Sequence, residues 1–173
     1  DDERLFILLG DASGHGIGPA LSSTQMTGML RVALRLGADL DSIFTHVNNQ
    51  LVEDLPEEHF VTAFLGMLDP RSHGVLYHSA GQGPLLHFHA ATGECEWRSP
   101  STFPMGYMRY PRLDSPSNIA LEPGDVLGLI SDGAFEAWEG KQIPLPLEYL
   151  PVGAAADNAG ITALSAREEP GAL

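Results

Sequence analysis

Short apolar runs separated by turn residues dominate the chain between residues 60 and 131. Runs at 60–68, 75–79, 85–89, 94–98, 119–121 and 125–131 all have strand length, and glycine-containing turns stand between most of them. An apolar run at 4–9 lies upstream. Between these regions, apolar residues recur at three- and four-residue spacing from residue 20 and again from residue 43, which indicates two helices. This order predicts an α+β fold in which helices flank a central antiparallel β-sandwich.

Local chemistry predicts where the two helices begin and end. Gly37 suits the end of the first helix, and Asp41 or Ser42 can cap the second, which Pro56 terminates. The tail has no assignable pattern, because prolines crowd residues 143–151 and an Ala/Gly-rich stretch follows. We expect a single domain over residues 1–173 whose tail, residues 140–173, is divergent or incomplete.

The charge balance is strongly acidic, with 23 Asp and Glu against 9 Lys and Arg. Binding to nucleic acid or to anionic lipid needs clustered basic residues, so we expect neither nucleic acid nor membrane as a partner. Cys95 is the only cysteine, which excludes an intrachain disulfide, and no apolar stretch approaches membrane-spanning length. These features predict a cytoplasmic protein.

Two apolar runs each deliver an aspartate into a glycine-containing turn that precedes a helical pattern. Asp11 follows the first run, and Asp132 follows the run that ends at residue 131. A carboxylate at a sheet edge is a natural ligand for a hard divalent cation, and two of them at one edge could hold a pair of ions. Each aspartate also has a structural explanation, Asp11 as the cap of a tight turn and Asp132 as a helix N-cap.

Six segments in order resemble the SpoIIE-like (RsbU-type) branch of the PPM, or type 2C, metal-dependent protein serine/threonine phosphatases. The similarity covers about residues 4–139. The segments are Gly-Asp-Ala-Ser-Gly-His-Gly at 10–16, Phe-Val-Thr-Ala-Phe through Leu-Asp-Pro at 60–70, Ala-Gly-Gln-Gly-Pro-Leu-Leu at 80–86, Pro-Met-Gly at 104–106, Leu-Glu-Pro-Gly-Asp at 121–125 and Ser-Asp-Gly-Ala-Phe-Glu-Ala at 131–137.

The resemblance implies a PPM-type αββα sandwich that holds two Mn²⁺ or Mg²⁺ ions at one sheet edge. By the same resemblance Asp11 would bridge both ions, the backbone carbonyl of Ala12 would help to bind one, and Asp132 would bind one through its carboxylate. A water activated by the ions would then attack phosphorus directly. The implied substrate is phosphoserine or phosphothreonine on a regulatory protein of bacterial signalling, such as an anti-sigma-factor antagonist. A sensor or receiver domain is expected upstream in the full-length protein.

The sequence departs from the family pattern at both ends. The family's upstream Gly-Gly-Asp segment is absent, and the stretch after Asp132 is shorter than usual. The closing Asp-Asp-x-Thr segment aligns on Thr162 with Ala159 and Gly160 in the aspartate positions, so Asp157 would serve as a metal ligand only through a two-residue slip. We therefore expect a fold that is truncated or incomplete at the N-terminus and near the C-terminus.

Five histidines are candidates for chemistry: His15 for acid–base catalysis, and His73, His78, His87 and His89 for a zinc site. His15 lies in the first glycine-rich loop and is a candidate proton donor to the leaving oxygen, while a structural histidine that closes the loop explains it equally well. His87 and His89 have the spacing that places two side chains on one face of a strand. No third zinc ligand is apparent nearby, so the sequence favours exposed strand histidines over a zinc site.

Three other functions fit part of the sequence. A catalytically degenerate PPM-like domain that binds proteins as a regulatory module would explain the missing carboxylates. A nucleotide-binding kinase-type domain is indicated only by the glycines of residues 14–18, and the chain lacks a Gly-x-x-x-x-Gly-Lys-Ser/Thr loop. A β-rich ligand-binding domain would explain the strands but not the two aspartate loops. An active phosphatase is the first expectation and the degenerate domain the second.

Overall fold

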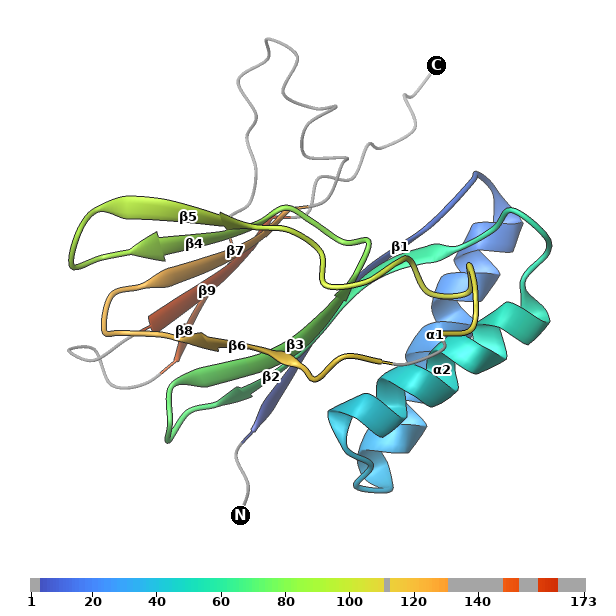
Figure 1. Cartoon of the computed structure of the whole chain (residues 1–173), viewed down its shortest axis with the longest axis horizontal. Coiled ribbons are helices and arrows are strands. Elements are labelled where there is room, and N and C mark those ends of the chain that lie inside the picture. The colour runs from blue at the N-terminus through green and yellow to red at the C-terminus, as the bar shows by residue number, and fades with distance from the viewer. Residues whose placement is uncertain (1–3, 111–112, 131–147, 153–158, 165–173) are drawn as a thin grey trace, which may run out of the picture. The chain divides into compact units, whose positions relative to one another are not determined.

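The computed structural model describes residues 4–110, 113–130, 148–152 and 159–164, and within them the chain forms two helices and nine strands (Figure 1). These elements fall into two compact units. The first unit comprises Asp1–Gln82 and Pro100–Ala120, and the second comprises Gly83–Ser99 and Leu121–Leu173. Each unit contains one sheet.

The sheet of the first unit has the strand order β1-β2-β3-β6, and all its neighbours are antiparallel. Its strands are β1 (Leu5–Ala12), β2 (Val61–Asp69), β3 (Gly74–Ala80) and β6 (Ser117–Ala120). Asp69-Pro70 opens the turn between β2 and β3, where the Asp69 carboxylate accepts a hydrogen bond of 2.8 Å from Arg71 N. This side chain–backbone bond is the usual reason for aspartate in a tight turn.

Two helices pack on one face of this sheet, α1 (Ile17–Arg35) and α2 (Leu40–Asp54) (Figure 1). Alternate residues of β2 point toward them, because side chains of a strand alternate between its faces. The resulting core is largely apolar and consists mainly of Met26 and Leu30 from α1, Ile43, Phe44, Val47 and Leu51 from α2, and Val61, Ala63 and Leu65 from β2.

The sheet of the second unit has the strand order β5-β4-β7-β9-β8. Its strands are β4 (Leu85–His89), β5 (Glu94–Arg98), β7 (Val126–Ile130), β8 (Glu148–Val152) and β9 (Ala159–Leu164). All neighbours are antiparallel except β7 and β9, which run parallel. Parallel neighbours require a long connection, and the chain between residues 130 and 159, which includes β8, provides it.

The predicted α+β class is confirmed, and the strands at 85–89 and 94–98 have the predicted limits. The cap of α2 differs from the prediction, because its N-cap is Asp39, whose carboxylate accepts hydrogen bonds from Ser42 N at 2.9 Å and Ser42 Oγ at 2.7 Å. The expected buried strand at 4–9 is only partly buried, since β1 is an edge strand of its sheet over the described residues. β8 and β9 lie in the tail, where apolar periodicity predicted no element and only the alignment on Thr162 with the family's closing segment pointed to the region of β9.

No helix in the described part of the chain combines the length and the apolarity that crossing a membrane requires.

Candidate active site

Asp11 lies at the end of the edge strand β1, and its side chain is exposed. In the β1–β2 register it is opposite Thr62, whose hydroxyl lies 3.4 Å from the Asp11 carbonyl oxygen and 3.2 Å from Gln82 Oε1. Because the backbone of Asp11 is paired in the sheet, the position of its Cα is set, and the residue is exposed. An exposed carboxylate on a rigid strand end is suited to binding a cation.

The loop that follows Asp11 is tied to the start of β2 by Ser13. The Ser13 amide donates a hydrogen bond of 2.9 Å to the Phe60 carbonyl, and the Ser13 hydroxyl accepts one of 3.0 Å from the Phe60 amide. These two bonds extend the β1–β2 pairing by one residue on each strand. They hold the loop in place directly after the two residues expected to bind metal, Asp11 and Ala12.

The glycines of this loop turn the chain from β1 into α1. Gly14 and Gly16 have φ angles of 93° and 87°, in the region that side chains disfavour. Gly16 is also the N-cap of α1, and no side chain there bonds to the first-turn amides. The sequence requirement for glycine at these two positions therefore comes from the sharp strand-to-helix turn.

His15 lies between these glycines and is exposed. Among the described residues, no hydrogen bond of its ring closes the loop, which is held instead by the hydrogen bonds of Ser13 with Phe60. Its suggested part in proton transfer stays a prediction.

The structure brings four of the six segments that resemble the phosphatase family together around the start of β2. Ala12 pairs with Val61, and Val61 exchanges two backbone hydrogen bonds of 2.8 Å with Met105. Gly81, which follows β3, forms a bridge with Ala63 on the side of β2 away from β1. Segments up to 94 residues apart in sequence, from position 11 to position 105, thus meet close to Asp11.

Asp132 and Asp157, the other predicted metal ligands, lie outside the described residues. Their participation with Asp11 and Ala12 in one site therefore stays a prediction. Sequence reasoning did not identify Thr62, which flanks Asp11 in the sheet. The only sequence feature that pointed to Thr62 was its place in the family-like segment at 60–64.

The sequence profile of the family described as Stage II sporulation protein E (SpoIIE) matches residues 1–159. The chain therefore belongs to the SpoIIE family of type 2C-like phosphatase domains.

Solved structures share the same fold. The RsbU and RsbW domains of a Mycobacterium tuberculosis protein are 25% identical, with a TM-score of 0.61 over 72% of this chain and 34% of theirs. The PP2C phosphatase domain of SpoIIE from Bacillus subtilis, solved with a fragment of its regulatory domain, is 18% identical, with a TM-score of 0.63 over 81% of this chain and 44% of that one. RsbX in complex with magnesium is 19% identical, with a TM-score of 0.57 over 72% of this chain and 58% of RsbX.

This chain thus spans between a third and three fifths of the length of these solved chains. No curated protein sequence matches it significantly.

Proposed function

We propose that this protein hydrolyses phosphoserine or phosphothreonine on a regulatory protein in a metal-dependent reaction. The observation that carries the proposal is the exposed carboxylate of Asp11 at the end of β1, in a chain of the SpoIIE family. The family consists of metal-dependent protein phosphatases, and the loop at residues 10–16 is the segment that resembles its metal-binding motif most closely.

The donor set fits the proposed ions. Asp11 offers a carboxylate and Ala12 a backbone carbonyl, and both are hard oxygen ligands of the kind that Mg²⁺ and Mn²⁺ prefer. The related RsbX has been solved in complex with magnesium. When bound, such ions would supply the Lewis acidity that activates water for attack on phosphorus and offsets the charge on the phosphoryl oxygens.

The residues of this chain would hold and orient the reactants. Asp11 and Ala12 would bind two ions together with Asp132 and, through a shifted register, Asp157. Ser13 would keep the loop in position through its bonds to Phe60. The exposed His15 would donate a proton to the serine or threonine oxygen as it leaves.

The proposed setting is bacterial signalling in the cytoplasm. We propose an anti-sigma-factor antagonist as the kind of substrate, and a sensor or receiver domain upstream. The similar Mycobacterium tuberculosis protein, which carries both an RsbU and an RsbW domain, supports this setting. We further propose that residues 1–173 belong to a single phosphatase domain.

The test is hydrolysis of p-nitrophenyl phosphate and of a phosphoserine peptide by the full-length protein, with and without Mn²⁺. Asp11→Asn is compared with Asp114→Asn, an exposed aspartate in the segment before β6. We expect metal-dependent turnover in the wild type, a loss of at least about 100-fold in Asp11→Asn, and no change in Asp114→Asn. The same variants are titrated with Mn²⁺ by calorimetry.

Absence of both turnover and Mn²⁺ binding in the folded wild type would reject the proposal. That outcome would favour the degenerate PPM-like domain that acts by binding proteins. Turnover that survives in Asp11→Asn would place the reaction elsewhere in the chain.

A further inference from the structure

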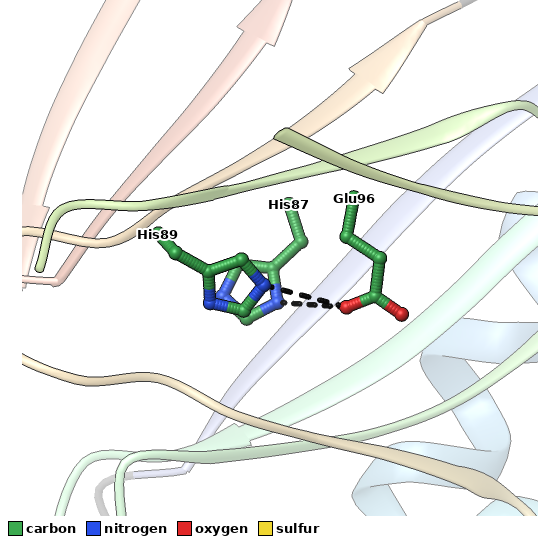
Figure 2. A group of neighbouring side chains, drawn as sticks. All are labelled: His87, His89 and Glu96. Carbon is green, nitrogen blue, oxygen red and sulfur yellow. Dashed lines mark hydrogen bonds and ion pairs between the residues drawn. The ribbon is translucent and has the colours of Figure 1, made fainter. Parts of the chain in front are cut away.

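The second unit contains a cluster of three potential metal ligands on the β4–β5 hairpin. His87 and His89 are two residues apart on β4, and Glu96 is directly opposite His87 in the β4–β5 register. All three side chains therefore lie on one face of the hairpin. Figure 2 shows their polar ends turned toward one another. If one donor atom is taken from each residue, the three atoms all lie within 4.8 Å of one another.

A second carboxylate, that of Asp125, contacts the other nitrogen of the His87 ring. His87 is only 2% exposed, and its Nε2 lies 3.0 Å from Asp125 Oδ2. Asp125 also accepts hydrogen bonds from Ala90 N at 2.9 Å and Glu122 N at 3.1 Å. Asp125 acts as the acceptor in both of these bonds, so we assign Nε2 of His87 as the donor to Asp125 Oδ2.

This hydrogen bond determines the state of the other ring nitrogen. With the proton on Nε2, neutral His87 presents a lone pair at Nδ1. Nδ1 is buried and has no hydrogen-bond partner among the described residues. Burying an unpaired polar atom is unfavourable, and a native protein normally satisfies such an atom. The arrangement of carboxylate, histidine and free nitrogen is the one in which proteins present histidine to a metal.

The neighbours of Nδ1 are metal-binding groups. Glu96 Oε2 lies 3.9 Å from His87 Nδ1, too far for a hydrogen bond, and 3.4 Å from His89 Nε2. Donor atoms around a tetrahedral Zn²⁺ are separated by about 3.3 Å, given Zn–N and Zn–O distances of about 2.0–2.2 Å. The three donor atoms lie within 4.8 Å of one another, and small rotations of the partly exposed His89 and Glu96 side chains would bring them to that spacing.

Arg98 is the one cation that already contacts this group in the described residues. Its Nη2 donates a hydrogen bond of 2.9 Å to Glu96 Oε2 and lowers the pKa of that carboxyl. A carboxylate has about four acceptor positions on two oxygens, so Glu96 can bind a metal and keep Arg98.

We propose that His87, His89 and Glu96 form a binding site for a divalent transition-metal ion, with Zn²⁺ as the expected occupant and Asp125 as the residue that orients His87. Two imidazole nitrogens and one carboxylate oxygen suit Zn²⁺ better than Mg²⁺ or Ca²⁺, which prefer oxygen ligands throughout. This site is independent of the ions proposed at Asp11.

The experiment is titration of the full-length protein with Zn²⁺ in competition with a chromogenic chelator. We expect one tight Zn²⁺ equivalent in the wild type that is retained in Asp11→Asn. Glu96→Gln and His89→Gln should each weaken its binding by at least about tenfold. His46→Gln, a change of an exposed histidine on α2, is the matched control and should bind Zn²⁺ like the wild type.

Nuclear magnetic resonance of ¹⁵N-labelled histidine adds a readout that does not depend on any variant. On addition of Zn²⁺, the His87 Nδ1 resonance should move to the position of a metal-bound nitrogen, while Nε2 stays protonated. Zn²⁺ affinity unaffected by both Glu96→Gln and His89→Gln would overturn the proposal. So would a His87 Nδ1 resonance that responds to acid but not to Zn²⁺, which would make the cluster an ion pair.

Discussion

Asn48, in the middle of α2, binds the backbone of Gly106 through its side chain. Asn48 Oδ1 accepts a hydrogen bond of 3.0 Å from Gly106 N, and Asn48 Nδ2 donates one of 3.1 Å to the Met108 carbonyl. Asn48 is completely buried. One amide thus satisfies two backbone groups of the turn that contains the Pro-Met-Gly segment, and it links that turn to the helix.

Replacing Asn48 should therefore destabilise the fold. Asn48→Ala leaves the Gly106 amide and the Met108 carbonyl without their partner, and we expect a loss of about 1–3 kcal/mol of unfolding free energy in urea denaturation. Asn49→Ala changes the neighbouring, partly exposed asparagine and should cost less than half as much. Equal losses in the two variants would contradict the role assigned to the buried amide.

Ser13→Ala should loosen the Asp11 loop with little effect on overall stability. The variant removes the acceptor of the Phe60 amide, so hydrogen exchange of that amide should accelerate by at least about tenfold. Metal-dependent turnover should fall by a similar factor, because the ligand-bearing loop loses its fixed position. Ser22→Ala removes a hydroxyl that bonds only within α1, to the Gly18 carbonyl, and should leave both readouts unchanged.

Gly81→Ala should lower the free energy of unfolding for two separable reasons. Gly81 has a φ of 66°, and a Cβ there would lie 2.6 Å from Pro104 Cγ. Gly37 has a similar φ of 73° but open space around the Cβ position, so Gly37→Ala measures the backbone strain alone. We expect about 1 kcal/mol from Gly37→Ala and clearly more from Gly81→Ala, as measured by chemical denaturation. A loss of stability in Gly81→Ala that is no larger than the loss in Gly37→Ala would show that Pro104 moves aside freely.

Asp125 should make stability depend on acid. Its folded-state pKa lies below the ordinary value of 3.8, because hydrogen bonds from Ala90 N, Glu122 N and His87 outweigh the opposite and largest single effect, burial. A depressed carboxyl pKa contributes stability above the unfolded-state value, and this contribution is lost as the pH falls through the folded-state pKa.

Unfolding free energies measured between pH 7 and pH 2 test this assignment. Asp125→Asn should be less stable than the wild type at pH 7, and its stability should fall less steeply below about pH 4. Asp114→Asn, which changes an exposed aspartate, should keep the wild-type slope. An unchanged acid slope in Asp125→Asn would mean that other carboxylates account for acid unfolding.

Local patterns in the sequence predicted most elements of the fold. The periodicity of apolar residues located both helices, and strand-length runs bounded by glycine located β4 and β5 with their observed limits. The start of α2 was wrong by two to three residues, because Asp39, Asp41 and Ser42 are all good N-cap residues. The burial of Leu40 decides among them, since it places the first turn of the helix against the core.

The two histidines of β4 show where sequence reasoning stopped. The sequence placed them correctly on one face of a strand but favoured exposed side chains and found no third ligand. Instead His87 is buried, and both carboxylates beside it become neighbours only through pairing, Glu96 from β5 and Asp125 from the turn before β7.

The sequence by itself therefore determined the α+β class, the order of the elements as far as β7, the family and Asp11 as the leading candidate ligand. These follow from local periodicity and from motifs, both of which are legible over a few residues. Only the tertiary structure decided which distant segments meet: Ser13 with Phe60, Asn48 with Gly106, and His87 with Glu96 and Asp125. Such contacts depend on strand register and helix packing, and these are set by the summed burial of many side chains rather than by any short stretch of chain.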